Sequence, residues 1–286
     1  HSQMNIDSGM PTQFINVTYD GDPAIDPVLP ILTQHRAIAQ SRLAETGIEN
    51  LSEEEAQERF LDAVGRISPL KGAKLGLVAS IQHLHLVFDY KKRFEDAGFE
   101  VEVPVGGARL TFPGQVLGCN YSGDDDEIGH YLFLGSGDFH PIGLALHTGK
   151  PLAMLDPYTG DASEMGAERI ERILRQRFGL IMAIQDAQNF AILIGEKPGQ
   201  MRRSLALKLK RTLAKQGKKG YLLALEHVGP DLIDFYPVDA FVNTACPRIA
   251  IDDSVKYAKP LVTPFELEVA LGVKKWETGY QFDEIP

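Results

Sequence analysis

The chain has 286 residues, of which 44% are hydrophobic and 24% charged, and its formal net charge is −10. These values are typical of an ordinary globular protein with one large domain or two smaller ones, and the acidic balance argues against a general nucleic-acid-binding surface. The sequence has no apolar run long enough for a membrane span, no signal-peptide pattern and only two cysteines, so a reducing, cytoplasmic environment is expected.

Strands and helices are predicted to alternate along the first half of the chain. Runs rich in apolar and β-branched residues indicate strands, and apolar residues at helical spacing indicate helices. The predicted strands cover residues 14–19, 75–80, 99–103, 131–134 and 152–155, and the predicted helices lie within 26–66 and at about 83–97 and 142–147.

The second half repeats this plan. Helices are predicted at about 162–177 and 201–216, and strands at 190–194, 221–225 and 239–243. Because such alternation is typical of parallel sheets covered by helices, we predict an α/β protein made of two related three-layer, parallel-sheet domains, residues 1–160 and 161–286. Each domain would contribute one cysteine.

The two cysteines follow predicted strand-like runs. Cys119 comes after a short apolar run between two glycines, and Cys246 follows the strand at 239–243 and precedes Pro247, which cannot donate a ladder hydrogen bond. Isolated cysteines are most often small buried hydrophobic residues, and 127 residues separate these two without any CxxC motif. Their positions nevertheless suit ligands, because open α/β sheets bind ligands at the carboxyl ends of their strands.

A glycine-rich turn follows the strand at 131–134. Gly135, Ser136 and Gly137 lead into a helix, and this arrangement is the sequence form of an anion-binding turn in which backbone N–H groups face the ligand. Turns of this composition also occur without any ligand, so the motif by itself leaves both interpretations open.

Several motifs, taken in order along the chain, resemble the archaeal diphthamide synthase family. They are 114-GQVLGCNY-121, 135-GSGDFHPIGLA-145, 156-DPY-158, 197-KPGQ-200, 243-NTACPR-248 and 259-KPLVTPFE-266.

The resemblance implies a non-standard radical S-adenosylmethionine (SAM) enzyme, a transferase that catalyses the first step of diphthamide biosynthesis. In this family, three homologous domains each supply one cysteine to a [4Fe-4S] cluster, and cleavage of SAM yields a 3-amino-3-carboxypropyl radical that adds to a histidine of translation elongation factor 2. Cys119 and Cys246 match the second and third cluster ligands, and the archaeal resemblance implies a homodimer.

The chain departs from the family pattern because it has no third cysteine. We therefore expect two of the three family domains here, without the N-terminal one. The residues expected to contact SAM are Gly135, Ser136, Gly137, His140, Asp156, Tyr158 and Gln200. The structural alternatives are that His140 caps its helix, that Asp156 only closes a turn and that Arg248 only pairs with Asp252 or Asp253, while His83 is as compatible with a structural role as with facing the substrate.

Two other functions fit the same features. A chain short of one ligand could be a non-catalytic partner subunit of the same pathway, and quinolinate synthase is likewise built from three α/β domains around a three-cysteine cluster. The iron content of the protein distinguishes a non-catalytic partner from either enzyme. The nucleoside product distinguishes a diphthamide synthase from a quinolinate synthase-like enzyme.

Overall fold

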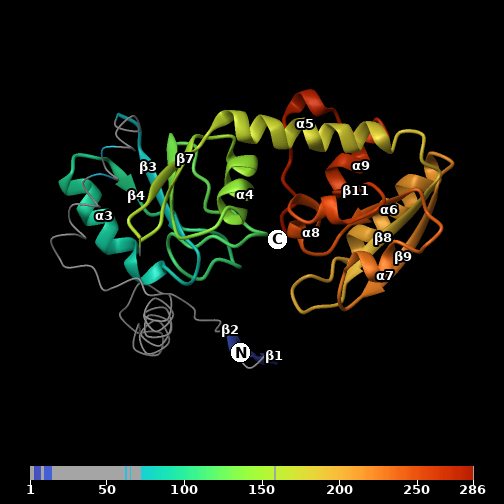
Figure 1. Ribbon diagram of the computed structural model, residues 1–286, viewed down its shortest axis with the longest axis horizontal. Helices are drawn as coiled ribbons and strands as arrows, with labels where there is room; N and C mark the ends of the chain where they lie inside the picture. Colours follow the sequence, from blue (N-terminus) through green and yellow to red (C-terminus); the bar gives the residue numbers. More distant parts are fainter. Residues whose placement is uncertain are drawn as a thin grey trace. The chain divides into compact units, whose positions relative to one another are not determined.

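The computed structural model describes residues 3–7, 10–14, 62, 65, 72–157 and 159–285 (Figure 1). Packing divides the chain into two compact units. Unit 1 comprises His1–Val116, Ser122–Ser136 and Ala153–Glu164, and unit 2 comprises Leu117–Tyr121, Gly137–Leu152 and Met165–Pro286. The turn that holds Cys119 and helix α4 (Phe139–Thr148) thus pack with unit 2.

Near the start of the chain, β1 (Gln3–Asp7) and β2 (Met10–Phe14) pair antiparallel. The strand predicted at 14–19 lies outside the described residues except for Phe14, and so do the helices predicted within 26–66 except for residues 62 and 65.

Unit 1 contains a five-stranded sheet in the order β4-β3-β5-β6-β7. Its strands are β3 (Leu75–Ala79), β4 (Val101–Glu102), β5 (His130–Leu134), β6 (Leu152–Leu155) and β7 (Ala162–Met165). Strand β3 pairs in parallel with β4 and with β5, and all five of its residues are buried. This burial explains its continuous apolar sequence, which is typical of a parallel strand covered on both faces.

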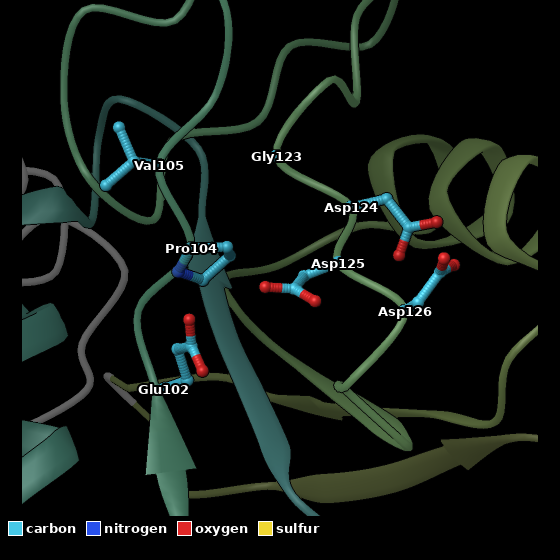
Figure 2. A pocket seen from close by; sticks show the side chains of 7 residues that line it. All are labelled: Glu102, Pro104, Val105, Gly123, Asp124, Asp125 and Asp126. Carbon is cyan, nitrogen blue, oxygen red and sulfur yellow. The ribbon is translucent and has the colours of Figure 1, made fainter.

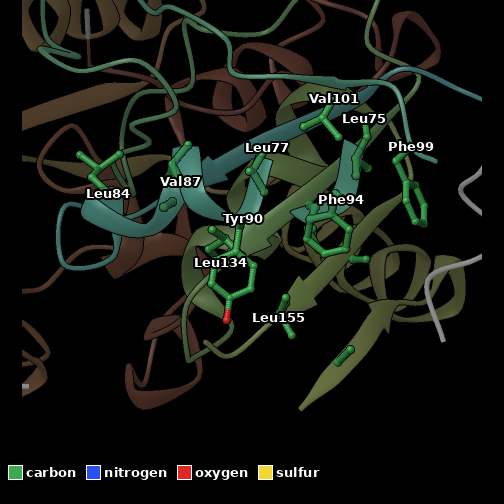
Figure 3. Packing of buried hydrophobic residues seen from close by; sticks show 14 residues of the cluster. Leu75, Leu77, Leu84, Val87, Tyr90, Phe94, Phe99, Val101, Leu134 and Leu155 are labelled. Atoms are coloured by element: carbon green, nitrogen blue, oxygen red, sulfur yellow. The ribbon is translucent and has the colours of Figure 1, made fainter. Parts of the chain in front are cut away.

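One helix of unit 1 packs on this sheet through an apolar stripe. The predicted helix at 83–97 is a 3-10 turn, η2 (Leu84–Leu86), followed by α3 (Val87–Asp96), and it ends before Gly98, whose φ of 89° favours glycine. Tyr90 and Phe94 lie one helical turn apart, and both point into the core with the sheet's leucines (Figure 3). The rings of Phe94 and Phe99 meet edge to face at 5.6 Å, which fixes the helix against the start of β4.

Unit 2 contains a four-stranded, all-parallel sheet in the order β11-β10-β8-β9. Its strands are β8 (Asn189–Gly195), β9 (Lys219–Leu225), β10 (Ala240–Asn243) and β11 (Leu261–Val262). Along β8, Phe190 and Ile192 belong to one hydrophobic cluster, while Ala191 and Leu193 belong to another. Since successive strand residues point to opposite faces, both faces of the sheet are buried at β8, and the α/β prediction is confirmed.

Five α-helices and two 3-10 turns complete the described part of unit 2. They are α5 (Ala167–Ala183), α6 (Arg203–Lys215), α7 (Pro230–Ile233), α8 (Pro247–Ile251), α9 (Pro264–Ala270), η3 (Ser254–Lys256) and η4 (Trp276–Thr278). Helix α6 buries Ala206, Leu209 and Leu213, which confirms the helix predicted at 201–216. Thr263 and Glu266 form a reciprocal capping box at the start of α9.

The helix predicted at 162–177 is wrong at both ends. Residues 162–165 form strand β7 beside β6, and helix α5 begins at Ala167 and continues to Ala183. The four residues of β7 have no strong local preference for a strand, so sheet pairing decides their conformation. The helix continues past Arg177 because Arg177 and Ile181 share its buried face.

No helix in the described part of the chain is long and apolar enough to cross a lipid bilayer.

Candidate functional site

The loop that carries Cys246 is held by hydrogen bonds to its own backbone and to β8. Strand β10 ends at Asn243, whose side-chain amide donates to the Cys246 carbonyl (2.9 Å) and whose side-chain oxygen accepts from the Ala245 N–H (3.1 Å). The Thr244 hydroxyl donates to the Leu193 carbonyl at 2.6 Å. Cys246 is the residue preceding α8, so it lies at the carboxyl end of the parallel sheet, as predicted.

Cys119 occupies a tight turn instead of a strand end. The Leu117 and Asn120 backbones exchange hydrogen bonds of 3.1 and 3.2 Å around it. The strand predicted before Cys119 is wrong, because residues 115–117 make only isolated bridges. A run this short between Gly114, whose φ is 72°, and Gly118 cannot extend into a ladder.

Both cysteines are partly buried and belong to unit 2. Burial raises the pKa of the Cys246 thiol, and a hydrogen bond from the Arg248 backbone together with the positive charges of Arg248 and Arg202 partly offsets this rise. The two arginines therefore favour the thiolate, which is the form that binds metals.

Tyr121 follows the Cys119 turn, and both thiols affect its hydroxyl electrostatically. Burial raises the pKa of its hydroxyl well above the usual value, and the ionised forms of Cys119, Glu284, Asp252 and Cys246 raise it further. The hydroxyl donates to the His140 carbonyl at 3.2 Å, and the ring contacts that of His147 with centroids 5.9 Å apart. Sequence reasoning gave Tyr121 no role, and only its position two residues after Cys119 could have suggested one.

The glycine-rich turn has the predicted backbone. Gly135 and Gly137 have φ values of 147° and 82°, which favour glycine, and α4 begins two residues after Gly137, three residues earlier than predicted. Gly135 and Ser136 belong to unit 1, whereas Gly137 and His140 belong to unit 2.

His140 lies in the first turn of α4 and does not cap it, since Asp138 precedes the helix. Burial lowers the pKa of the His140 imidazole, and the positive charge of Arg248 lowers it further, so the ring is neutral at pH 7. Arg248 forms an ion pair with Asp252 at 3.4 Å, the pairing that the sequence offered as its structural role. Its guanidinium also lies over the Phe139 ring, 5.2 Å from the ring centroid.

In unit 1, two of the residues expected to bind SAM meet at the carboxyl ends of β5 and β6. The Gly135 N–H donates to the Leu155 carbonyl at 2.9 Å, which places Gly135 beside Asp156. Asp156 closes the turn that follows β6, accepting from the Thr159 N–H at 3.4 Å. His83 borders the same spot, because a Cβ atom built on Gly135 would lie 3.0 Å from its ring, and burial lowers its pKa while the charge of Asp156 opposes the shift.

Gln200 lies beside the Cys246 loop in unit 2. A Cβ atom built on Gly195, the last residue of β8, would lie 3.0 Å from the Ala245 Cβ and 3.6 Å from the Gln200 Cβ. Tyr158 lies outside the described residues. The residues expected to contact SAM are thus distributed over both units, with Gln200, Gly137 and His140 in the unit that holds the thiols.

An acidic pocket of about 330 Å³ opens in unit 1 beside β4 (Figure 2). Its carboxylates come from Glu102 and from Asp124, Asp125 and Asp126. Glu102 pairs with Lys74, and Asp124 accepts from the Tyr131 hydroxyl at 2.7 Å. Within the described ranges, no three His, Cys, Asp or Glu side chains are grouped closely enough to hold a metal ion.

Gly143→Ala is expected to destabilise unit 2 by about 1–3 kcal/mol, because the new methyl group overlaps a packed side chain. A Cβ atom built on Gly143 in α4 would lie 2.1 Å from the Tyr121 hydroxyl oxygen. Gly179→Ala is the matched control, since Gly179 is exposed in α5 and its Cβ would have no neighbour within 4 Å; it should stabilise the helix by about 0.5–1 kcal/mol. Urea unfolding of both variants measures the difference, and equal midpoints would contradict the expectation.

Comparison with known proteins identifies the family. The sequence model of the diphthamide synthesis proteins matches residues 49–281. The chain is 37% identical, over 80% of its length, to the 2-(3-amino-3-carboxypropyl)histidine synthase of Pyrococcus horikoshii, and 26% identical, over 75% of its length, to that of Methanocaldococcus jannaschii. It spans 65% and 56% of these two relatives.

The solved structures agree with the sequence matches. A crystal structure of Dph2 from Pyrococcus horikoshii with a 4Fe-4S cluster superposes with a TM-score of 0.73 at 36% identity, covering 80% of this chain and 65% of that one. A second crystal structure of the same protein superposes with a TM-score of 0.74. The chain therefore belongs to the family of diphthamide synthesis proteins.

Proposed function

We propose that the chain forms part of an iron–sulfur, SAM-dependent transferase that makes 2-(3-amino-3-carboxypropyl)histidine on translation elongation factor 2, the first step of diphthamide biosynthesis. The observation that carries this proposal is the position of Cys119 and Cys246, which lie in one compact unit. The relatives named above carry this activity in their names.

The two thiols suit an iron–sulfur cluster by their chemistry. Thiolates are the ligands that such clusters select, and the charges of Arg202 and Arg248 partly offset the burial that raises the pKa of the Cys246 thiol. The sequence contains no third cysteine, so a third thiolate would come from outside these 286 residues. This fits our proposal that residues 1–160 and 161–286 are the middle and C-terminal members of three repeated, three-layer domains.

The residues of this chain would bind and orient SAM. A bound, reduced cluster would supply the electron that breaks the bond between the SAM sulfur and its γ-carbon, leaving methylthioadenosine and a carbon radical. The neutral His140 imidazole, the Gln200 amide and the backbone N–H groups of Ser136 and Gly137 are donors or acceptors suited to the polar groups of SAM. The proposed SAM-binding residues remain Gly135, Ser136, Gly137, His140, Asp156, Tyr158 and Gln200.

Elongation factor 2 is the proposed protein substrate, and a homodimer is the proposed assembly. Free thiols that must remain reduced for metal binding also favour a cytoplasmic setting.

Anaerobic product analysis tests the proposed function. After reconstitution with iron and sulfide, reduction with dithionite and addition of SAM, methylthioadenosine should form above the level of a protein-free control, because cleavage occurs at the γ-carbon. The control reaction uses the chain without iron. Deoxyadenosine as the main nucleoside would contradict the proposed cleavage, and a lack of any product would be followed by the same assay with an added N-terminal domain.

A non-catalytic partner role is the second candidate, and the presence of only two cysteines favours it. A chain with this role would bind little iron by itself and would form no product even with the N-terminal domain present. The family match gives no support to a quinolinate synthase-like function.

A further inference from the structure

The segment Phe282–Ile285, called the strap below, holds the Cys119 turn by backbone hydrogen bonds. The Ile285 N–H donates to the Cys119 carbonyl at 2.8 Å, and the Asn120 side-chain amide donates to the Ile285 carbonyl at 3.1 Å. These bonds join residues about 165 positions apart in the sequence. They act on the cysteine's own peptide, so they fix the backbone from which its thiol projects.

Side chains of the strap hold the residues that follow the turn. The Tyr121 N–H donates to the Glu284 carboxylate, whose other oxygen lies 3.5 Å from the His147 Nδ1 atom. The Phe282 ring meets the Tyr121 ring edge to face at 5.4 Å. The strap thus supports the turn and also the Tyr121 side chain that follows it.

Arg202 joins the strap to the loop of the second cysteine. Its guanidinium donates to the Thr244 carbonyl at 2.9 Å and to the Ala245 carbonyl at 3.0 Å, the two residues before that cysteine. The same group donates to both oxygens of Asp283 at 2.6 and 2.7 Å and to the Glu284 carbonyl at 3.2 Å. The Arg202 and Asp283 side chains are only 10% and 8% exposed, so solvent screens this pair little.

We propose that Arg202 and the strap are positioning elements that hold the Cys119 and Cys246 loops in a fixed arrangement for shared metal binding. This inference rests on the proposed function. Arginine suits the task because its planar group carries five N–H donors, enough for the three carbonyls and both Asp283 oxygens, whereas a lysine ammonium carries only three. The match to the family ends at residue 281, so the strap lies beyond the matched residues.

The arrangement can be tested without iron by cross-linking the two thiols. The chain has only two cysteines. A bis-maleimide can therefore link only Cys119 to Cys246 within one chain, and the rate of this cross-link depends on the distance and orientation between the two thiols. Arg202→Met should lower the rate of this cross-link, relative to single maleimide addition, by about tenfold, because the second addition depends on orientation. The measurement uses bis-maleimides of several lengths, so that one of them matches the distance between the thiols, and mass spectrometry quantifies the cross-linked product.

Substitutions of Glu284 and a conservative substitution of Arg202 show which of their interactions matter. Glu284→Gln keeps an oxygen that accepts from the Tyr121 N–H and should preserve the cross-link, whereas Glu284→Ala removes that acceptor and should lower its rate. Arg202→Lys keeps the charge but should lower the rate as Arg202→Met does. Should Arg202→Met fail to fold by circular dichroism, the contrast between the two Glu284 variants decides.

Tyr280→Phe is the control for a general loss of stability. This substitution removes a hydroxyl that donates to Glu266 at 2.9 Å in the same unit. That hydrogen bond involves no residue of either cysteine loop. The proposal is overturned if Tyr280→Phe lowers the cross-linking rate as much as Arg202→Met, or if both Arg202 variants cross-link at the unmodified rate.

Iron binding then separates this inference from the proposed function. Arg202→Met should weaken iron–sulfur binding by about 10- to 100-fold, the usual effect of losing a partner that orients a ligand. An unmodified chain that binds no iron but shows the cross-linking contrast would keep the positioning role and count against the proposed function. Normal iron binding in Arg202→Met, with no cross-linking contrast, would reject the positioning role alone.

Discussion

Replacing either Cys119 or Cys246 with alanine is expected to lower iron–sulfur binding and methylthioadenosine formation by more than about 100-fold. Loss of a residue that only orients a ligand already costs about 10- to 100-fold in metal affinity, and these variants remove a ligand itself. Iron per chain and the visible absorbance of the cluster, measured after anaerobic reconstitution, check the first expectation. The nucleoside assay checks the second.

Serine variants of the same positions control for the size of the side chain. Cys246→Ser retains the shape of a side chain that is partly buried beside α8, so far-ultraviolet circular dichroism should be unchanged while iron binding is lost. A Cys119→Ala or Cys246→Ala protein that keeps its full iron content would rule that thiol out as a ligand.

Arg177→Met is expected to destabilise unit 2 by about 3–5 kcal/mol, because it leaves the Glu266 carboxylate buried without its cation. The two side chains are 1% and 0% exposed. Arg177 on α5 donates to both carboxylate oxygens of Glu266 on α9, with a distance of 2.7 Å from Nε to Oε1, and also donates to the Ala250 carbonyl at 2.6 Å. Urea unfolding followed by circular dichroism measures the change in the free energy of unfolding.

A double variant distinguishes an unpaired charge from a loss of packing. Arg177→Met combined with Glu266→Gln removes both charges, so it should be less unstable than the sum of its two single variants. Purely additive effects would show that the two charges are not coupled. Arg175→Met, on the exposed face of α5 with its partner Glu171 at 3.8 Å, is the matched control and should change stability by less than about 1 kcal/mol.

Local sequence patterns were sufficient to predict the main elements of both sheets. The apolar runs of β3, β5, β8 and β10 are continuous because these strands are buried, and such runs can be recognised without any knowledge of their partners. The helix boundary at Gly98 and the turn at Gly135 were equally predictable, because each needs a backbone conformation that glycine adopts readily. The same local reasoning failed for β7, whose residues become a strand only through pairing with β6.

The sequence by itself determined the α/β class, the two thiols and, by its motifs, the family. Only the tertiary structure decided that the Cys119 turn packs in the same unit as Cys246, and that Arg202 and the strap join their loops. Local preferences extend over a few residues, whereas Asn120 and Ile285 meet across 165 positions. Contacts at that separation depend on how the whole unit packs, and a buried arginine such as Arg177 has no local signal that distinguishes it from a solvated one.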